Sequence, residues 1–407
     1  MRGPHRSGRQ PPHVLLVAST LDDNGGIPVC VAQLAGGLHR IGIGVEVVGQ
    51  RSGALAPALQ SLAAAHGVPV TAAHFPWNPA GQAAAALAMR RHVIRQATEA
   101  AAAGRRFVVH SHGVWVAPVI AAVDTAVALG AGVVISPHGM LRHDAMEKSR
   151  WRKRAALTLV VRRLIATAGS LHATSADEAD DLARLFPGCH PTLVPLGIDP
   201  VAPSPEFARP TGRPRTAGYL GRLLPIKNLD GLLEAWAAAA PRGWRLVLAG
   251  PGEASYVDTL RGRARDLGIG AAVEFLPAVP RSAIGGFLGG LDLFVLASRS
   301  EAFSLVVGEA LAAGVPVIAS TAAPWEGVVS RGCGWWVAPD PTSLTGALRD
   351  ATMRPVAELA EMGHRGAEWI RREYDWDHVA RRHLAELYEP ALGPPSIQPV
   401  SIPHDAP

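Results

Sequence analysis

The stretch VWVAPVIAAVDTAVALGAGVVISP, residues 114–137, decides how the chain is interpreted, because it is long and apolar enough to be taken for a membrane span. Asp124 is its single charged residue. Gly130 and Gly132 divide the stretch into an Ala-rich part with the composition of a helix and a Val-Ile run with the composition of a strand. This is the pattern of a buried α/β unit, so we predict a helix followed by a strand and not a membrane helix.

Short β-branched runs alternate with longer Ala-, Leu- and Arg-rich runs along the rest of the chain. The runs expected to form strands in the first half are residues 13–19, 45–49, 107–111, 133–137, 171–175 and 191–196. Those in the second half are residues 217–221, 244–250, 273–277, 291–298 and 315–320. Because strands that alternate with helices form right-handed crossovers, the pattern predicts parallel sheets with helices on both faces.

The chain is too long for one ordinary domain, since its 407 residues exceed the roughly 100–200 residues that a domain usually holds. A proline-rich segment without periodicity separates the two sets of strands, as expected for a linker. The predicted fold class is α/β, with two Rossmann-like, doubly wound parallel-sheet domains facing across a cleft. The boundaries that follow are a flexible N-terminus (1–12), a first domain (13–200), a linker (201–216), a second domain (217–375), a C-terminal helix (376–392) and a flexible tail (393–407).

The composition favours a soluble enzyme of a reducing compartment. Hydrophobic residues make up 48% and charged residues 18% of the chain, which is enough apolar material for sizeable cores. The three cysteines, Cys30, Cys189 and Cys333, are widely spaced and form no C-x-x-C pair, which argues against disulfides and a zinc site. The basic residues 1–12 lead directly into the first strand and lack the form of a secretory signal. We therefore expect a cytoplasmic protein.

Ligands bind doubly wound sheets beyond the carboxyl ends of the strands, so the loops there hold the candidate site residues. No G-x-G-x-x-G or Walker loop follows any strand, which excludes the usual nicotinamide and P-loop chemistry. In the first domain, Gly25 and Gly26 would let the backbone approach a ligand closely, although an ordinary tight turn explains them equally well. His138 lies in the loop SPHGML (136–141), where it either contacts substrate or is a structural, hydrogen-bonded histidine.

A zinc site at the histidines of HSHG (110–113) is not expected. We expect the side chains of His110 and His112 to point to opposite faces of the strand end, with no carboxylate beside them. A packed, hydrogen-bonded role is the default interpretation of this pair.

The second domain carries two cations in its first strand-to-helix loop. Arg222 and Lys227 precede a helix expected to start near Asn228. Fixed cations at a helix N-terminus form a receptor for a diphosphate, which is costly to desolvate without such partners; an ordinary charged surface is the alternative. A second anion site is expected at the start of a later helix, from the backbone N–H groups of Phe303, Ser304 and Leu305.

Two acids lie in the otherwise apolar segment SRSEAFSLVVGEALAAGVPVIAS (298–320). Glu301 is placed in the loop after a strand, and the helix that follows is expected to end at Gly314. Glu309, inside that helix, needs a partner, and the hydroxyls of a ribose or sugar are suitable donors to it. The alternatives are a helix cap for Glu301 and a buried ion pair for Glu309.

Taken together, these features resemble the retaining glycosyltransferases of the two-Rossmann-domain, GT-B kind, which use nucleotide-diphosphate sugars. The resemblance covers roughly residues 13–390 and rests on the Gly-Gly loop, SPHGML, a Gly-Arg pair five residues before a lysine, the Glu-x7-Glu pair and APWEGVVSRGCGWWVAPD (323–340). SPHGML and the Trp-rich segment further resemble the branch of the family that assembles capsule, exopolysaccharide and lipopolysaccharide.

The resemblance implies catalytic roles for Arg222, Lys227, Glu301 and His138. It implies donor or nucleotide binding by Gly25, Gly26, Phe303, Ser304, Leu305 and Glu309. The two cations would hold the donor diphosphate, Glu309 would bind the ribose hydroxyls, and Glu301 and His138 would face the transferred sugar. The first domain would bind the acceptor and the second the donor, with helix 376–392 packing back on the first domain.

The implied donor is a UDP- or GDP-sugar, and the implied acceptor is a glycan or a polyprenyl-linked glycan. No cofactor and no metal are expected, since fixed cations and helix N–H groups stabilise the negative charge that grows on the leaving diphosphate. The D-x-D motif at Asp375-Trp376-Asp377 lies at a helix junction and is not expected to bind metal. Sugar, base, acceptor and linkage are not decided by the sequence.

The chain departs from the family pattern in two loops. Ala302 and Ser304 stand where many relatives have glycine, and Asn228 replaces the common glycine after the lysine. The departures at Ala302 and Ser304 leave open a catalytically silent nucleotide-sugar-binding partner. A nucleotide-sugar epimerase is a second alternative, because the same fold hosts such enzymes, which need no acceptor.

Segment 141–164 carries eight of the 39 basic residues, together with Trp151. A basic helix of this kind is expected either to rest on anionic lipid at the inner face of the cell membrane or to be a solvated helix face. Nucleic acid is not an expected partner, because basic residues are concentrated here and no nucleic-acid-binding module is visible.

Overall fold

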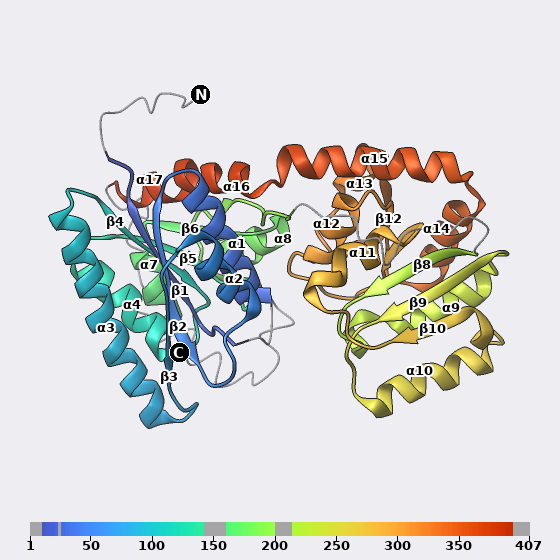
Figure 1. Cartoon of the computed structure of the whole chain (residues 1–407), viewed down its shortest axis with the longest axis horizontal. Coiled ribbons are helices and arrows are strands. Elements are labelled where there is room, and N and C mark those ends of the chain that lie inside the picture. The colour runs from blue at the N-terminus through green and yellow to red at the C-terminus, as the bar shows by residue number, and fades with distance from the viewer. Residues whose placement is uncertain (1–9, 23–25, 142–159, 200–213, 394–407) are drawn as a thin grey trace. The chain divides into compact units, whose positions relative to one another are not determined.

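The computed structural model describes residues 10–22, 26–141, 160–199 and 214–393 of the chain. The chain divides into two compact units, one formed by Met1–Gly197 together with Trp376–Pro407 and the other by Ile198–Asp375. We call them unit 1 and unit 2 and describe each by itself (Figure 1). Within the described ranges, no helix combines the length and the hydropathy needed to cross a membrane.

Unit 1 is built on a parallel sheet whose strand order, in the described residues, is β3-β2-β1-β4-β5-β6-β7. The strands are β1 (His13–Ala18), β2 (Gly44–Arg51), β3 (Val70–His74), β4 (Phe107–His112), β5 (Gly132–Ser136), β6 (Ser170–Ala173) and β7 (Thr192–Leu193). The central strands β4 and β5 are buried along their whole length. Helices cover both faces of such a sheet, which explains why these strands carry apolar runs instead of an alternation of apolar and polar residues.

The helices of unit 1 are α1 (Gly26–Arg40), α2 (Pro57–His66), α3 (Pro79–Ala102), α4 (Ala117–Ala128), α7 (Arg162–Thr167), α8 (Ala176–Leu185), α16 (Trp376–Arg382), the π-helical η6 (His383–Tyr388) and α17 (Glu389–Ala391). Helix α1 packs against α2 and α16, whereas α3 packs against α4. The returning C-terminal segment fits closely on α1, because a Cβ at Gly37 would come 2.7 Å from Trp376 O. Arg40 also pairs with Asp377 at 2.6 Å, so one carboxylate of the D-x-D motif is engaged in this packing.

Unit 2 contains a second parallel sheet, with the order β10-β9-β8-β11-β12-β13 in the described residues. Its strands are β8 (Arg215–Leu220), β9 (Trp244–Ala249), β10 (Val273–Leu276), β11 (Leu293–Leu296), β12 (Val317–Ser320) and β13 (Gly334–Val337). Its helices are α9 (Leu229–Ala239), α10 (Ala254–Asp266), α11 (Ile284–Gly289), α12 (Leu305–Ala312), α13 (Gly327–Ser330), α14 (Pro341–Met353) and α15 (Val356–Glu373), with 3-10 turns η3 (Pro225–Lys227), η4 (Gly270–Ala272) and η5 (Arg281–Ala283).

The predicted α/β class with two doubly wound parallel sheets is confirmed by the strand orders of the two units. Segment 114–137 forms α4 and then β5, and Gly130 between them has a φ of 67°. The predicted strand 191–196 is wrong in extent: only Thr192–Leu193 pair, because Pro191 and Pro195 have no N–H group to donate. Strands β3 and β13 were not predicted, since their short Ala-rich and Trp-rich sequences lack a clear strand pattern.

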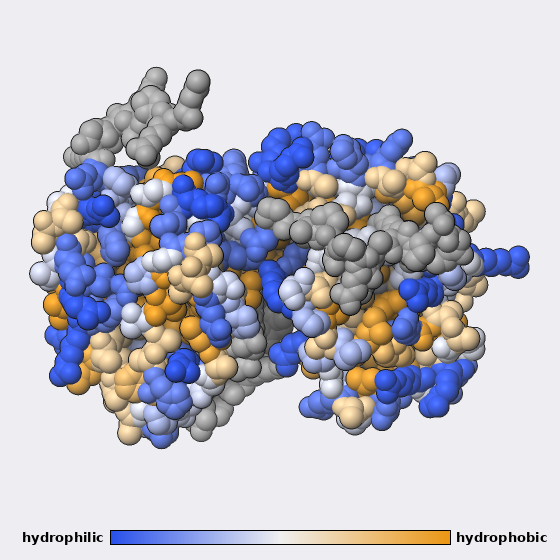
Figure 2. Space-filling model, viewed as in Figure 1, coloured by the Kyte–Doolittle hydropathy of each residue, from blue (hydrophilic) through white to orange (hydrophobic). Residues whose placement is uncertain are grey.

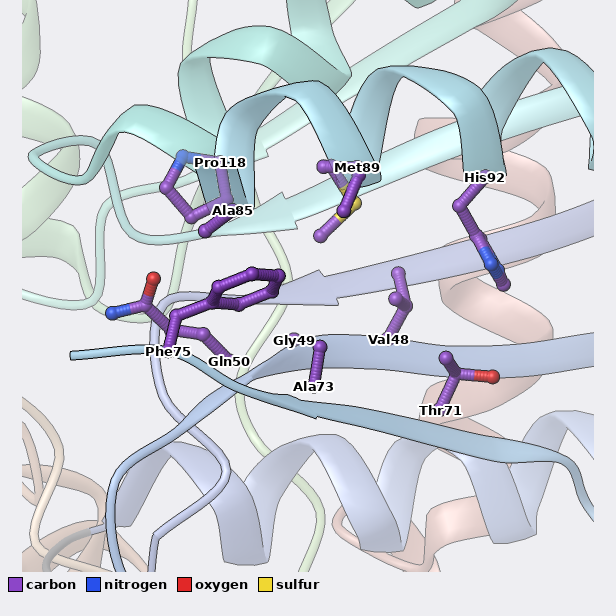
Figure 3. Close-up of a pocket in the computed structure, with 11 residues that line it drawn as sticks. Val48, Gly49, Gln50, Thr71, Ala73, Phe75, Ala85, Met89, His92 and Pro118 are labelled. Atoms are coloured by element: carbon purple, nitrogen blue, oxygen red, sulfur yellow. The ribbon is translucent and has the colours of Figure 1, made fainter. Parts of the chain in front are cut away.

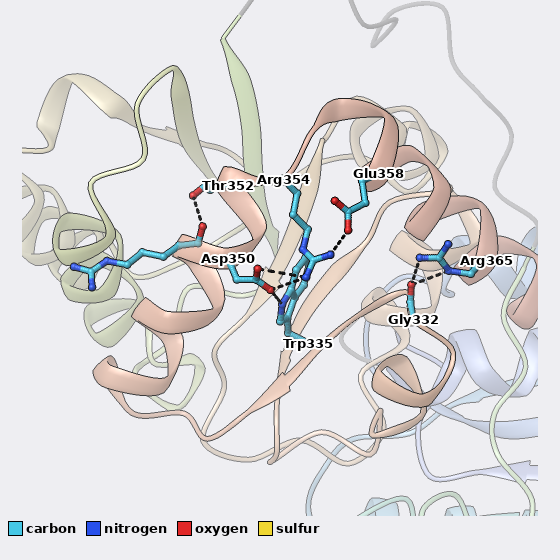
Figure 4. A network of polar contacts seen from close by, with 8 residues as sticks. Gly332, Trp335, Asp350, Thr352, Arg354, Glu358 and Arg365 are labelled. Atoms are coloured by element: carbon cyan, nitrogen blue, oxygen red, sulfur yellow. Dashed lines mark hydrogen bonds and ion pairs between the residues drawn. The ribbon is translucent and has the colours of Figure 1, made fainter.

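The Trp-rich segment of unit 2 has structural contacts (Figure 4). Trp335 Nε1 donates to Asp350 Oδ2 at 2.7 Å, and the Arg354 guanidinium lies over the Trp335 ring with 5.4 Å to its centroid. Arg354 also pairs with the carboxylates of Asp350 and Glu358. This cluster fixes the connection between α14 and α15.

On the face visible in Figure 2, hydrophilic and hydrophobic residues are interspersed over both units.

Candidate active site

Lys227 and Glu301 are brought together at the carboxyl ends of β8 and β11 in unit 2. Lys227 ends η3, and Glu301 lies in the loop before α12, as predicted from the sequence. Lys227 Nζ lies 2.7 Å from Glu301 Oε1, and Ser298 Oγ donates to the same oxygen at 2.6 Å. The loops are also joined through the backbone, where Arg299 N donates to Ile226 O at 2.9 Å. Oε2 of Glu301 has no partner within the described part of the chain.

Arg222 is exposed in the same loop between β8 and α9. Its backbone is held by Tyr219, whose hydroxyl donates to Arg222 O at 2.9 Å, and burial raises the pKa of this phenol so that it stays protonated. A Cβ at Gly250 would come 1.9 Å from Gly221 O, so only glycine lets the loops after β8 and β9 approach this closely. The guanidinium of Arg222 itself has no partner among the described residues and is open to a ligand.

Two residues beside these cations have a positive φ angle, which is unusual for residues other than glycine. Asn228 has a φ of 57°, and Ser304 has a φ of 65°. The Asn228 side chain donates to Ala297 O at 3.1 Å and to Pro339 O at 2.8 Å, which ties the loops after β8, β11 and β13 together. The left-handed conformation explains why the family pattern favours glycine at both positions. Asparagine tolerates this conformation better than serine does.

The start of α12 offers backbone donors. In the described residues, no acceptor is bound to the N–H groups of Phe303, Ser304 and Leu305. The ring of Phe303 packs in the core against Trp325, with ring centroids 5.2 Å apart, and Trp325 Nε1 donates to Phe303 O at 2.7 Å. Phe303 therefore contributes only its backbone. Open N–H groups at a helix N-terminus suit an anion such as a phosphate.

Glu309 is buried in α12 and pairs with an arginine that the sequence analysis did not single out. Arg281 Nη1 lies 2.6 Å from Glu309 Oε1, and Arg281 also lies 3.8 Å from Asp199. An ion pair is therefore present, although only its carboxylate is buried, and Oε2 of Glu309 has no partner among the residues described. The Arg281 side chain is 42% exposed and can move aside, so ribose binding by Glu309 stays a prediction. No sequence signal links the two, because Arg281 follows β10 and Glu309 lies beyond β11.

In unit 1, His138 lies in the loop after β5, with a φ of 52°, followed by Gly139 at 72°. The buried carboxylate of Glu178 holds this loop: its Oε1 accepts from Gly139 N at 2.5 Å, and its Oε2 accepts from Thr174 N and Oγ1, both at 2.8 Å. The sequence analysis missed Glu178. The signal was present, because Ser175 and Glu178 have the spacing of a capping box at the start of α8, and Ser175 Oγ accepts from Glu178 N at 3.2 Å.

His138 contacts His112, and His112 contacts His110. The rings of His110 and His112 have centroids 4.2 Å apart, so they lie on the same face of β4. The expectation of opposite faces was wrong, because side chains two residues apart on a strand point to the same side. His112 Nδ1 lies 2.8 Å from His138 Nε2, and burial lowers the pKa of His138 to about 4. His138 is therefore a neutral imidazole near neutral pH.

The histidine group continues toward the C-terminal segment. Ser136 Oγ lies 2.7 Å from His110 Nε2 and 2.5 Å from His172 Nδ1. His110 Nδ1 lies 3.0 Å from the Tyr388 hydroxyl, and the ring of His383 stands edge-on to that of His172. Burial lowers the pKa of His110, His112, His172 and His383 below the ordinary 6.5 as well. The group is thus a set of neutral, packed rings that joins β4, β5 and β6 to η6.

The remaining predicted positions contribute less. Gly26 begins α1, and a Cβ there would meet no atom of the described residues within 4 Å, so these residues do not require glycine at this position. Gly25 lies outside the described residues, as do residues 142–159 of the basic segment and residues 201–213 of the predicted linker.

A small apolar cavity of about 130 Å³ lies between α3 and the β2–β3 edge of the unit 1 sheet (Figure 3). Phe75, Met89 and Ala73 point into it. Its polar boundary includes His92, whose Nε2 lies 2.9 Å from Glu46 Oε1. None of the predicted site residues lines this cavity.

Two family models match the chain, one in each unit. The family model described as glycosyl transferases group 1 matches residues 205–369, which include the Lys227 and Glu301 loops. The model described as glycosyl transferase 4-like domain matches residues 25–197, which include the His138 loop. The chain therefore belongs to the group 1 glycosyltransferases, and the resemblance to this family that was stated from the sequence is confirmed.

Individual relatives are similar at modest identity. A D-inositol 3-phosphate glycosyltransferase of Rhodococcus erythropolis is 32% identical, over 60% of this chain and 60% of the relative. A protein of the same name from Streptomyces griseus is 26% identical, over 91% of this chain and 85% of the relative. The GDP-mannose:cellobiosyl-diphosphopolyprenol alpha-mannosyltransferase of Xanthomonas campestris is 28% identical, over 66% of this chain and 70% of the relative. The chain thus spans less than two thirds of the first relative.

The fold matches that of HepE (Alr3699) from Anabaena, solved in complex with UDP and glucose. The TM-score is 0.73 at 17% identity, and the match covers 93% of this chain and 100% of that chain. At this identity, the likeness shows that both chains have the GT-B fold.

Proposed function

We propose that the chain is a retaining, metal-independent hexosyltransferase that moves a sugar from a UDP- or GDP-sugar to a polyprenyl-linked glycan in surface or extracellular polysaccharide biosynthesis. The observation that carries the proposal is the contact of Lys227 with Glu301, at 2.7 Å, beside the open N–H groups of α12. A nucleotide-diphosphate sugar requires positive charge and N–H donors for its phosphates and an acceptor for its sugar hydroxyls. Lys227 and the start of α12 supply the former, and the free oxygen of Glu301 supplies the latter.

The chemistry follows from charge. When the bond between the anomeric carbon and the diphosphate breaks, negative charge grows on the diphosphate and positive charge on the sugar ring. Lys227, Arg222 and the N–H groups at the start of α12 stabilise the diphosphate, an effect worth several kcal/mol when the donors are already in place. A donor phosphate oxygen accepts the proton of the attacking hydroxyl on the same face, so the anomeric configuration is retained.

The other site residues bind and orient the donor. Oε2 of Glu301 accepts from hydroxyls of the transferred sugar, while Oε1 stays bound to Lys227 and Ser298. Glu309 accepts from the ribose hydroxyls once Arg281 shares or releases the carboxylate. His138, neutral and fixed by Glu178 through Gly139, is assigned to the donor sugar by the family resemblance of its loop.

Two comparisons support the choice of substrates. The Xanthomonas relative is named for GDP-mannose as donor and a diphosphopolyprenol-linked cellobiosyl acceptor. HepE was solved with UDP and glucose. Both uridine and guanosine diphosphate sugars are therefore tested as donors. We prefer a lipid-linked glycan as acceptor over the D-inositol 3-phosphate that names the other relatives, because SPHGML and the Trp-rich segment resemble those of polysaccharide-assembly enzymes.

The test is a donor panel. Purified full-length chain is incubated with UDP-, GDP- and ADP-sugars, and nucleotide release is measured with and without polyprenyl-linked acceptors. Slow release without acceptor and faster release with it support transfer. A new sugar epimer without any acceptor indicates an epimerase instead, and binding without turnover under all conditions indicates a silent binding partner.

Paired variants test the site. Glu309→Gln is expected to weaken nucleotide binding, and Lys227→Ala mainly to slow transfer. Glu234→Gln and Arg263→Ala, which alter an ion pair of 2.6 Å between α9 and α10, are the matched controls for charge removal. Wild-type turnover in both site variants contradicts the assignment.

The peripheral membrane contact is tested separately. Flotation with anionic liposomes is expected to fall when Arg150, Arg152, Lys153 and Arg154 are neutralised. Unchanged flotation removes segment 141–164 from the proposal.

A further inference from the structure

A larger cavity of about 380 Å³ opens at the carboxyl edge of the unit 1 sheet. The loops after β1, β2, β3, β4 and β5 all contribute to its lining, through Thr20, Ser52, Trp77, Trp115 and Met140 respectively. The loops at the carboxyl ends of five neighbouring strands thus converge on one space, which is where ligands bind parallel sheets. None of these five residues was predicted as a site residue. The volume of the cavity lies within the roughly 300–1,000 Å³ of ligand pockets.

The walls of the cavity carry two accessible indole rings. Trp77 is 50% exposed, and Trp115 is partly exposed. By contrast, Trp236, Trp325 and Trp376 are buried in the cores of their units. Indole rings left accessible on a cavity wall offer a broad apolar face to a ligand, and the flat C–H face of a pyranose ring matches such a surface.

The floor of the cavity accepts hydrogen bonds. Asp22 Oδ1 accepts from Ser52 N at 2.9 Å and Gly53 N at 2.8 Å, and Oδ2 accepts from Ser52 Oγ at 3.0 Å and Thr20 Oγ1 at 3.2 Å. Each of these two hydroxyls therefore gives its single hydrogen to Asp22. Thr20 Oγ1 also accepts from Asp22 N at 3.2 Å, which leaves it one lone pair for a ligand, while Ser52 Oγ keeps two. Sugar hydroxyls, which are donors, fit such a floor.

The charge of the floor disfavours anions. Burial alone would raise the pKa of Asp22, but the hydrogen bonds from Gly53 and Ser52 outweigh it and hold the pKa below its usual value, so the group is a carboxylate at neutral pH. Among the described lining residues there is no lysine or arginine. A phosphate or carboxylate, which at neutral pH mainly accepts hydrogen bonds, would meet acceptors and a negative charge here.

We propose that this cavity binds an uncharged pyranose unit of the acceptor, with its ring against Trp77 and Trp115 and its hydroxyls donating to Thr20 and Ser52. The acceptor end that receives the sugar is then a neutral glycosyl unit and not a sugar phosphate or an inositol phosphate. The inference rests on the proposed function only in naming the bound sugar as the acceptor.

Steady-state kinetics test the acceptor role. With the donor identified by the panel, Trp77→Ala and Trp115→Ala are each expected to raise the acceptor KM at least about tenfold, as for tryptophans at the centre of a binding site, with a smaller change in kcat. Trp77→Phe, which keeps an aromatic face, is expected to restore part of the affinity. Leu87→Ala is the control, because Leu87 is 51% exposed on α3 and does not line the cavity. Thermal unfolding of each variant checks the fold.

Binding without turnover provides a second measurement. Saturation-transfer NMR is recorded on the full chain with methyl hexosides, neutral disaccharides and hexose 6-phosphates, without donor. Signals from the neutral sugars that disappear in Trp77→Ala and Trp115→Ala, with weaker or no signals from the phosphates, support the proposal.

The outcomes separate this inference from the proposed function. Neutral sugars that bind through Trp77 and Trp115 while no donor is ever turned over support the cavity and contradict the transferase proposal. Transfer activity whose acceptor KM stays within twofold of wild type in both tryptophan variants overturns the cavity and leaves the transferase standing. Preferred binding or glycosylation of the phosphorylated sugars also overturns the inference.

Discussion

The ammonium group of Lys227 lies 2.7 Å from Oε1 of Glu301, so two of the side chains predicted to act on the donor are in direct contact. The side chains of the pair are 21% and 10% exposed, respectively. In this environment, each charge stabilises the other, and Ser298 supplies a further donor to the carboxylate. A donor diphosphate that binds here shares a cation that is already fixed, which lowers the entropy lost on binding.

Lys227→Met is expected to lower kcat of sugar transfer by about 10²–10³, the usual effect of removing one fixed donor from a developing negative charge. It is also expected to lower the free energy of unfolding by about 1–3 kcal/mol, because among the described residues Glu301 then keeps Ser298 as its single side-chain donor. Turnover assays and urea denaturation measure the two effects. Arg263→Met, at an ion pair on the surface of unit 2, is the control and should change either quantity little.

The double variant Lys227→Met/Glu301→Gln separates stability from catalysis. Removing both charges leaves no uncompensated carboxylate, so most of the lost stability should return while transfer stays slow. If the double variant loses as much free energy of unfolding as the two single variants lose together, the ion pair has no stabilising effect beyond those of its two separate side chains.

Ser304→Gly is expected to raise the free energy of unfolding by about 0.5–1 kcal/mol. The φ of 65° at Ser304 costs a residue with a Cβ roughly 1–2 kcal/mol, and the extra backbone freedom of glycine in the unfolded state offsets part of the gain. Ser304→Ala keeps the strain and should not stabilise, which makes it the matched control. Equal stability of both variants in chemical denaturation would contradict the role of the backbone angle.

The sequence predicted most strands and the placement of Glu301 in a loop, because these depend on local composition and on the residues that end a helix. It could not predict the partners of the candidate residues. Arg281 reaches Glu309 from another loop, and Glu178 reaches Gly139 from α8. Such contacts depend on which loops the sheet order places side by side, and a single sequence does not contain that information.

Unit 1 is expected to lose stability as the pH falls below about 6.5. Burial lowers the pKa of His110, His112, His138, His172 and His383, so the folded chain keeps these rings neutral while the unfolded chain protonates them near 6.5. Because the unfolded state binds more protons in this window, stability is complete above pH 6.5 and falls below it, by up to about 1.4 kcal/mol per pH unit for each histidine. For His138, the loss continues down to about pH 4, which is its pKa in the folded chain.

Hydrogen exchange resolved by peptide measures this loss in the full chain between pH 8 and pH 5, after correction for the intrinsic pH dependence of exchange. Peptides of β4 and η6 should lose protection before those of β8 and β9 in unit 2. His383→Leu removes one titrating ring next to His172. The number of protons taken up on unfolding, which sets the slope of stability against pH, should therefore fall by about one. Unchanged protection of β4 and η6 down to pH 5 would contradict the prediction.

His112 is expected to act as a hydrogen-bond donor that sets the tautomer of His138. Nε2 of His112 is buried and has no partner in the described part of the chain, and a buried N–H without an acceptor is rare. The hydrogen of His112 is therefore on Nδ1 and is donated to His138 Nε2 at 2.8 Å, which leaves His138 protonated on Nδ1 and able to donate to a substrate oxygen.

His112→Asn keeps an N–H group close to the position of Nδ1, whereas His112→Leu removes it. We expect the leucine variant to turn over the nucleotide-sugar donor more slowly than the asparagine variant, at equal thermal stability. In the wild type, we expect the ¹⁵N chemical shifts of His138 to show its proton on Nδ1. A proton on Nε2 of His138 would reverse the direction of the bond and contradict the prediction.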